Sequence, residues 1–172
     1  MALPSDYAYL VLGESGQNVY VYKFNGTRFN SFQTITLSGS GSKYVSITND
    51  HQLLTVSDRT ANTVNRYFFN QTAQEFQPFP NQLPAYSSNL WFAEVNQNRQ
   101  LLFVCTLNQT YVYTDIEDNI TELQKLEGGQ SYLKVSEDGR NLIIGGLGYL
   151  IVYESSCDKE AGYFYNTTSG EC

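Results

Sequence analysis

This sequence predicts an all-β fold in the form of a partial β-propeller, and three observations support the prediction. Short strand-like stretches recur along the 172 residues between turns rich in Gly, Asn, Asp and Ser, and no segment keeps a helical period. Residues 9–35 and 53–79 repeat one pattern, including FNGT at 24–27 against FNQT at 69–72. Strands beginning at Tyr44, Trp91 and Tyr132 are spaced by 47 and 41 residues, the period of a four-stranded propeller blade.

The expected strands form about four units, with strands a to d in chain order. Strand a begins at 44, 91 and 132, strand b at 53, 101 and 141, and strand c at 19, 64, 110 and 149. Residues 116–126 are the one helix candidate, but they carry β-branched residues and a turn-like 117–119, so 121–126 are expected to be a strand. The first unit begins at b and the last ends after c, so the end blades are incomplete. Either earlier blades lie in a longer polypeptide or a partner chain completes the ring; a β-sandwich is the alternative architecture.

The chain changes character after residue 155, so residues 1–155 are expected to form the propeller and 156–172 the start of a cysteine-rich module. Cys157 and Cys172 flank a glycine- and aromatic-rich stretch, which is typical of a disulfide-stapled extracellular module. If they pair, the short loop would contribute about 3 kcal/mol. Their partners could instead lie beyond residue 172.

Composition narrows the function classes. The chain is 15% aromatic and 16% charged with a net charge of −7, which argues against disorder and against a nucleic-acid binder. No apolar run reaches membrane-spanning length, and the first residues lack the pattern of a signal peptide. Metal ligands at useful spacing are too few for zinc, and residues 115–118 lack the glycine of an EF-hand loop. No metal or cofactor is expected.

The sequence offers no convincing catalytic group. His51 is the single histidine and falls in an a-to-b turn, while Cys105 lies in an apolar strand and is expected to be a small core residue. The a strands, which line the channel of a propeller, offer these polar residues: Tyr44, Ser46, Thr48, Glu94 and Lys134. Glu94 and Lys134 are expected to be rim or pairing residues. These residues predict that the protein is not an enzyme.

Five Asn-x-Thr sequons are candidate N-glycosylation sites; they are Asn25, Asn70, Asn108, Asn119 and Asn166. Three of them (25, 70 and 119) fall in c-to-d turns, which share one rim of a propeller. Asn108 falls in a b-to-c turn on the opposite face, and Asn166 lies in the tail. Glycans at such turns would project into water. The sequons therefore predict an extracellular or cell-surface location.

Two resemblances follow from these residues. The phrases at 54–64 and 9–22 resemble the YVTN-type repeat of lactonase-like propellers and microbial surface-layer proteins, over roughly residues 7–155. The tail from Cys157 resembles the first half of a growth-factor-receptor or ephrin-receptor-like cysteine-rich repeat. Together they resemble large cell-surface glycoproteins of protists.

The combination predicts a non-catalytic glycoprotein whose propeller contacts other protein chains. Assembly into a surface coat or fibre is the extension of that hypothesis. Its expected partners are protein chains and N-linked glycans, with no nucleic acid and no membrane span in this segment. Two alternatives stay open: a lactonase- or lyase-like enzyme with its active site on other blades, and a ligand-binding receptor ectodomain.

Overall fold

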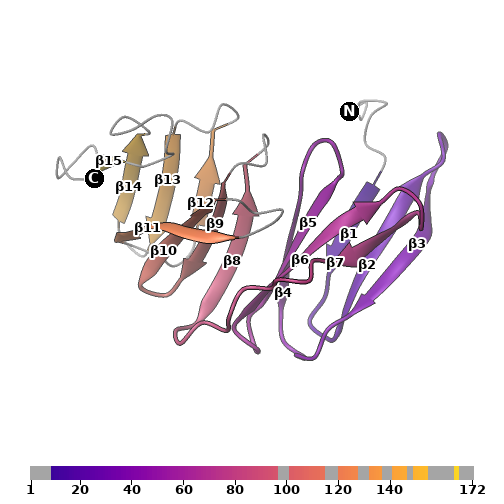
Figure 1. Cartoon of the computed structure of the whole chain (residues 1–172), viewed down its shortest axis with the longest axis horizontal. Coiled ribbons are helices and arrows are strands. Elements are labelled where there is room, and N and C mark those ends of the chain that lie inside the picture. Colours follow the sequence, from indigo (N-terminus) through magenta and orange to yellow (C-terminus); the bar gives the residue numbers. More distant parts are fainter. Residues whose placement is uncertain are drawn as a thin grey trace.

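The computed structural model consists of four antiparallel β-sheets that follow one another along the chain (Figure 1). It describes residues 9–96, 101–114, 120–127, 132–136, 141–146, 149–154 and, for the backbone, 165–166. All the regular elements among these residues are strands. A helix able to cross a membrane is therefore not found in the described ranges.

The strands fall into one three-stranded and three four-stranded sheets. The first sheet contains β1 (Tyr9–Gly13), β2 (Asn18–Phe24) and β3 (Phe29–Thr36), and the second contains β4 (Lys43–Ile47), β5 (Leu53–Asp58), β6 (Thr63–Asn70) and β7 (Glu75–Pro78). The third contains β8 (Leu90–Val95), β9 (Leu102–Thr106), β10 (Gln109–Thr114) and β11 (Thr121–Glu127). The fourth contains β12 (Tyr132–Val135), β13 (Asn141–Gly146), β14 (Tyr149–Glu154) and β15 (Tyr165–Asn166).

The strand pattern predicted from the sequence is confirmed. Strands a, b, c and d of the second sheet are β4, β5, β6 and β7, and each pairs antiparallel with the next. The first sheet has b, c and d alone among the described residues. The last sheet gains a strand that the sequence did not predict, because β15 pairs with the end of β14. The boundary at residue 155 stays a prediction.

Each sheet packs face to face on the next through alternating apolar side chains, as expected when successive residues of a strand point to opposite faces. Between the first two sheets lie Val19, Val21, Ile35, Leu54, Val56 and Phe69, among others. Between the second and third lie Leu53, Val64, Leu90, Ala93 and Val104. Between the third and fourth lie Phe103, Cys105, Val112, Leu142 and Ile144. The core is thus divided into three layers, one at each sheet–sheet contact.

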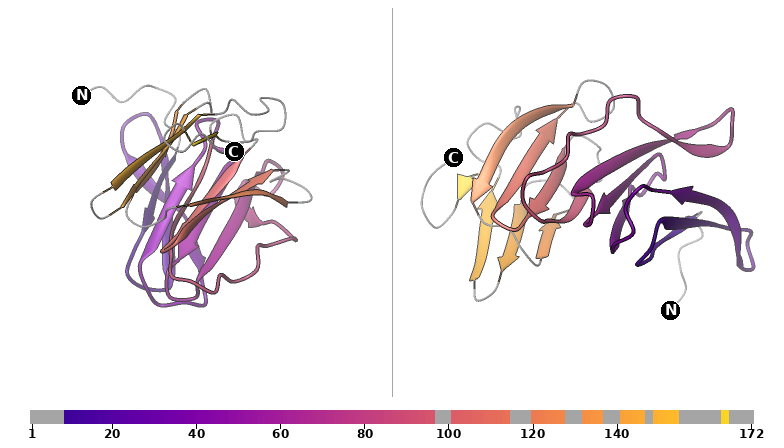
Figure 2. Two further views of the ribbon diagram at one scale, coloured as in Figure 1. Left: turned by 90° about the vertical axis from the view of Figure 1, so that its left-hand side faces the viewer. Right: turned by 90° about the horizontal axis from the view of Figure 1, so that it is seen from below.

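The sheets stand side by side in an arc, which Figure 2 shows from two further directions. Their first strands approach one another at one edge of this arc, which we call the inner edge. The rings of Tyr44 on β4 and Phe92 on β8 are 5.1 Å apart, and Lys134 on β12 reaches Glu94 on β8. The inner edge therefore brings side chains from three sheets together.

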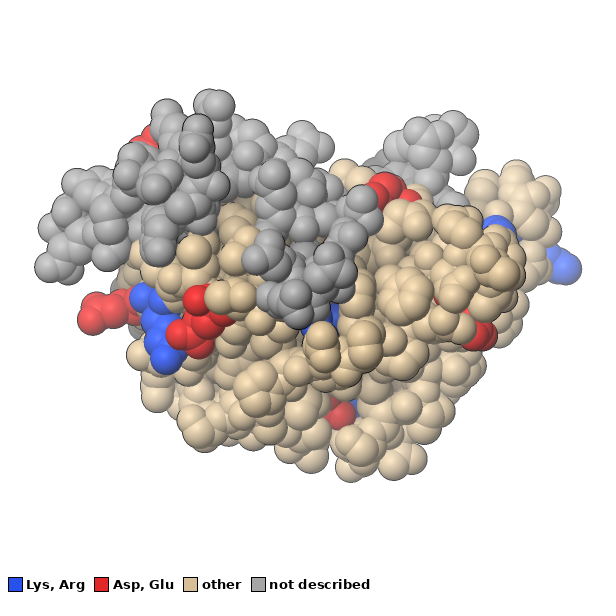
Figure 3. Space-filling view, in the orientation of Figure 1, with Lys and Arg blue, Asp and Glu red and all other residues tan. Residues whose placement is uncertain are grey.

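The face drawn in Figure 3 is largely uncharged over its described part, with a few mixed acidic and basic groups.

Candidate functional site

A cavity of about 440 Å³ opens at the inner edge and collects side chains from three sheets. Its lining comes from β4, the turn after β5, β8 and β12: Ser42, Lys43, Tyr44, Arg59, Trp91, Phe92, Glu94, Tyr132, Leu133 and Lys134. The strand order explains the assembly, because the first strand of each sheet lies at the same edge. A second cavity of about 430 Å³ shares Ser42 and Arg59 with the first.

The ion pair between Glu94 and Lys134 is the central polar feature of the cavity. Lys134 Nζ donates to Glu94 Oε1 at 3.0 Å, and the side chains are 58% and 10% exposed, respectively. The hydrogen bond to Glu94 raises the pKa of Lys134 above its ordinary value. Burial, and then the charge of Glu94, raises the pKa of the nearby Tyr44 hydroxyl. Both shifts favour the protonated forms, an ammonium on Lys134 and a neutral phenol on Tyr44.

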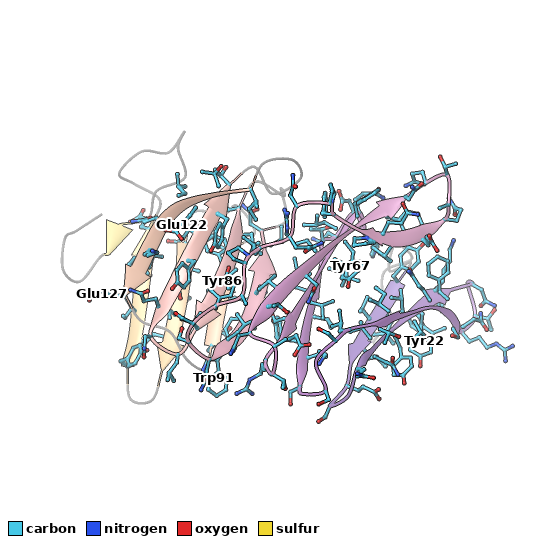
Figure 4. All side chains as sticks on the ribbon, turned by 60° about the horizontal axis from the view of Figure 1, so that its bottom comes forward. Tyr22, Tyr67, Tyr86, Trp91, Glu122 and Glu127 are labelled. Atoms are coloured by element: carbon cyan, nitrogen blue, oxygen red, sulfur yellow. The ribbon has the colours of Figure 1, made fainter. Side chains whose placement is uncertain are left out.

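Arg59 and Trp91 form a second, cationic wall of the cavity. The guanidinium carbon of Arg59 lies 3.9 Å from the centroid of the Trp91 ring, within the range of a cation–π contact. The buried indole N–H of Trp91 has no hydrogen-bond partner in the part of the chain that the structure describes. Figure 4 shows where Trp91 lies on the third sheet. The wall thus combines a positive charge with an aromatic face.

A buried ion pair holds the turn that carries Arg59. Lys43 Nζ lies 3.2 Å from Asp58 Oδ2, with both side chains inaccessible to solvent, and it also donates to the carbonyls of Gly39 and Gly41. Asp58 Oδ1 accepts from the backbone N–H groups of Thr60 and Ala61 at 3.0 and 3.1 Å. These contacts hold the 39–41 loop and the turn at residues 60–61 against the ion pair. Arg59 therefore leaves the sheet from a rigid turn.

The glycines of the 39–41 loop permit this close packing. A Cβ at Gly39 would lie 2.2 Å from Asp58 Oδ2, and one at Gly41 would lie 1.6 Å from Thr60 Oγ1. A larger residue at Gly39 would push the loop away from the Asp58 carboxylate, and one at Gly41 would displace the Thr60 side chain.

The arrangement suits a small ring compound with polar substituents more than a metal ion. The aromatic rings of Tyr44, Trp91 and Tyr132 offer flat apolar surfaces, while Arg59 and Lys134 offer two cations. No cluster of three His, Cys, Asp or Glu side chains occurs among the described residues. A ligand with a carbonyl or an acidic group could contact Arg59 or Lys134, while its hydroxyl groups could donate to Glu94.

The structure brings together three of the residues that the sequence placed at the channel, namely Tyr44, Glu94 and Lys134. Ser46 and Thr48 do not line the cavity, and Thr48 instead donates to Asp50 in the turn that follows β4. His51 lies in that turn with a φ of 58° and contacts the Tyr9 ring; burial lowers the pKa of its imidazole. Cys105 is fully buried, as predicted.

Sequence reasoning missed Arg59, Trp91 and Tyr132 as lining residues. Trp91 and Tyr132 were noted only as the first residues of strands, and Arg59 follows a strand in a turn of unremarkable composition. The usable signal was position, because residues at the start of each strand a lie at the inner edge.

The predicted modification sites lie on turns where they are described. Asn25 follows β2 and Asn70 ends β6, and each side chain accepts from two backbone N–H groups of its own turn. Asn108 is exposed between β9 and β10, but Thr110 of the same sequon is fully buried. Asn119, Cys157 and Cys172 lie outside the described residues, as does the side chain of Asn166. Glycosylation and the disulfide stay predictions.

Comparison with known proteins identifies the fold. The sequence matches no protein-family model and none of the curated proteins. Among solved structures, a candidate 6-phosphogluconolactonase from Bacteroides fragilis matches with a TM-score of 0.77 at 12% identity, over 96% of this chain and 52% of that one. The periplasmic gluconolactonase of Pseudomonas aeruginosa matches with a TM-score of 0.69 at 14% identity, over 95% and 50%. The fold is that of a lactonase-like β-propeller.

The likeness extends to proteins with other names. Hsv2 of Kluyveromyces lactis matches with a TM-score of 0.68 at 17% identity, over 90% of this chain and 48% of that one. At these identities the likeness concerns the fold. The chain spans about half the length of each of these three solved structures.

These comparisons correct one expectation. The prediction that the protein is not an enzyme is wrong, because the structures that share its fold include proteins named as lactonases. That prediction rested on the lack of a convergent carboxylate cluster, and it overlooked that one carboxylate can converge with cations from neighbouring sheets. The interpretation as a structural surface glycoprotein gains no support from the comparisons, whereas the alternative of a lactonase-like enzyme does.

Proposed function

We propose that this chain forms part of a lactonase-like propeller enzyme that hydrolyses the lactone of a sugar acid in the cavity at the inner edge. The observation that carries the proposal is the pairing of the nearly buried Glu94 with Lys134 inside that cavity. The names of the lactonases that share the fold favour a cyclic ester as substrate.

The cavity contains the groups that ester hydrolysis needs. Glu94 would take a proton from a water molecule as its oxygen attacks the lactone carbonyl carbon. The ammonium of Lys134 would stabilise the negative charge that develops on the carbonyl oxygen. The C–O bond of the ring then breaks, and the leaving ring oxygen takes a proton from the Tyr44 hydroxyl. Glu94 would release its proton to solvent, and solvent would return one to Tyr44. The product is the open-chain hydroxy acid.

Arg59 and Trp91 would bind the substrate rather than react with it. An aromatic face packs against the C–H groups of a sugar ring, and a guanidinium binds carboxylate or phosphate in two-point contacts. Arg59 therefore favours a substrate that carries an acidic substituent.

The test is lactone hydrolysis by the purified chain and its variants, followed by acid release at constant pH and corrected for spontaneous hydrolysis. We expect Glu94→Gln to lower kcat by about 10²-fold or more, because the amide cannot accept the proton. Lys134→Met should lower kcat, and circular dichroism checks that it is folded, because the change leaves the nearly buried Glu94 without its partner.

The matched control is the ion pair between Lys125 and Glu122 on β11, whose Nζ and Oε1 atoms lie 3.3 Å apart. Both side chains are exposed, and the pair lies outside the cavity. Glu122→Gln and Lys125→Met should leave hydrolysis unchanged. Equal activity of the wild-type chain and Glu94→Gln would reject the assigned role of Glu94. Absence of any hydrolysis above background across several sugar lactones would reject the proposed function for the chain tested.

An extracellular or cell-surface location belongs to the same proposal. The five sequons support it, and one protein of the same fold is named as periplasmic. Peptide mass mapping of the natural protein with and without glycosidase tests it: mass shifts at Asn25 and Asn70 are expected, and unmodified asparagines at both would contradict it.

A further inference from the structure

Both ends of the arc present an apolar sheet face that no described sheet covers. On the first sheet, Leu10 pairs with Tyr22 and Leu12 with Tyr20, so these four side chains share the face directed away from the second sheet. We call this the first end face; Figure 4 marks Tyr22 on it. On the fourth sheet, Ile143 pairs with Val152, and Leu150 lies on the same side two residues earlier. These three residues form the last end face.

The first end face has the side chains of a buried sheet face, as a comparison with the equivalent positions of the second sheet shows. Matching the pairing of β1 and β2 to that of β5 and β6 makes Leu10 equivalent to Leu54 and Leu12 equivalent to Val56. Leu54 and Val56 are inaccessible because the first sheet covers them, whereas Leu10 and Leu12 are 39% and 46% exposed. The first end face thus carries core residues without a cover.

The last end face shows the same contrast. Matching the pairing of β13 and β14 to that of β9 and β10 makes Leu150 equivalent to Thr110 and Val152 equivalent to Val112. Thr110 and Val112 are fully buried under the fourth sheet, but Leu150 is 65% exposed. The last end face thus exposes a leucine at a position that is buried in the third sheet.

The edge of the first sheet is open as well. In the second and third sheets a strand a precedes strand b, but among the described residues the order of the first sheet begins at β1. The loop after β1 contacts the second sheet through a bridge between Ser15 and Ser42. An open strand edge can pair with a further strand.

We infer that these two end faces bind a second copy of this chain, so that two arcs close one ring. The chain covers 48 to 54% of the lengths of four matching propellers, so two copies supply about the strands of one such ring. In this arrangement the first end face of each copy packs on the last end face of the other. A two-fold axis then repeats the same contact twice and leaves no end face uncovered.

The closed pair would also complete the cavity described above. Tyr132 lines that cavity and is 52% exposed at the open side of the fourth sheet. The inner edge of the partner's first sheet would lie beside it. The inference stands on packing alone and does not depend on the proposed lactonase activity.

Sedimentation equilibrium of the purified 172-residue chain tests the inference. We expect the mass of a dimer at micromolar concentration, where one chain is 19.5 kDa. Leu12→Asp and Leu150→Asp should each give a folded monomer, because each places a charge in both contacts. Ala73→Asp, on the exposed turn after β6, is the matched control and should remain a dimer. Far-ultraviolet circular dichroism confirms that each variant is folded.

A mixing experiment separates ring closure from nonspecific association. Leu12→Asp and Leu150→Lys chains should each be monomeric alone, yet form a dimer when mixed at equal amounts. One contact of the mixed pair is then unaltered and the other joins opposite charges. A folded wild-type monomer would overturn the inference and assign the end faces to further blades of a longer polypeptide. A series of larger species, or no gain on mixing, would overturn it too.

Discussion

Lys43 and Asp58 are the residues on which the geometry of the candidate site most depends. A buried charge whose partner is removed costs about 3 kcal/mol or more, because nothing replaces the lost water. Lys43→Met leaves Asp58 in that condition next to the turn that carries Arg59. We therefore expect a loss of about 3 kcal/mol in the free energy of unfolding, measured by urea denaturation followed by circular dichroism.

The double variant Lys43→Met, Asp58→Asn shows whether charge is the cause. The asparagine keeps the side-chain oxygen that accepts from Thr60 and Ala61 but has no charge to bury, so it should recover much of the loss. Lys125→Met breaks an exposed pair instead and should cost less than about 1 kcal/mol. Equal stability of Lys43→Met and the wild-type chain would contradict the assigned role.

Other residues show where sequence reasoning stops. Arg66 is fully buried in β6, at the position that valine takes in β2 and β10. Its guanidinium lies over the Phe79 ring at 5.0 Å and donates to the Asn81 carbonyl, and burial lowers its pKa. An arginine in an alternating strand is ordinarily placed on the solvent side. Its partners, Phe79 and Asn81, lie in the segment that follows β7. That segment reaches Arg66 only through the tertiary fold, which the local sequence pattern does not encode.

At the scale of elements, the turn after β5 connects two sheets through Asn62. Its side-chain oxygen accepts from the backbone N–H of Leu90 at 3.0 Å, and its carbonyl accepts from Tyr86 at 2.8 Å. Its φ of 53° is left-handed, a conformation that asparagine and glycine tolerate. The residue thus orients the start of β8, the strand that carries Trp91 and Glu94.

Two substitutions separate these contributions. Asn62→Gly keeps the left-handed backbone and loses the bond to Leu90, so the free energy of unfolding should fall by about 1 kcal/mol. Asn62→Ala adds backbone strain of about 1 kcal/mol. Thermal or urea unfolding should therefore rank wild type above Gly and Gly above Ala. If Ala matched wild type, neither the bond nor the backbone conformation at Asn62 would be stabilising.

The elements themselves were largely predictable, for a physical reason. Period-two alternation and turn residues are local signals, and they placed the first strands of the last three sheets at 44, 91 and 132, within a residue of β4, β8 and β12. The two residues of β15 carry no such signal, because a pairing that short is decided by its neighbour β14.

At the scale of the whole molecule, the repeat predicted the arc but not which residues converge at its inner edge. Convergence depends on how far each sheet rotates against the next, which no local pattern encodes. Glu94 and Lys134 are 40 positions apart, about one repeat, so both were correctly placed on channel-side strands. Their direct contact, which makes them pairing residues as expected, was decided by packing.

The buried hydroxyl residue of one sequon has a consequence for the order of events in biosynthesis. Thr110 is inaccessible in β10, and its hydroxyl lies 3.8 Å from the sulfur of Cys105. An oligosaccharyltransferase must reach the threonine of a sequon as well as its asparagine. A sugar chain on Asn108 could then be attached only before β9 and β10 had paired. Occupancy at Asn108 relative to Asn25 would therefore act as a clock, recording how quickly the third sheet closes on a nascent chain.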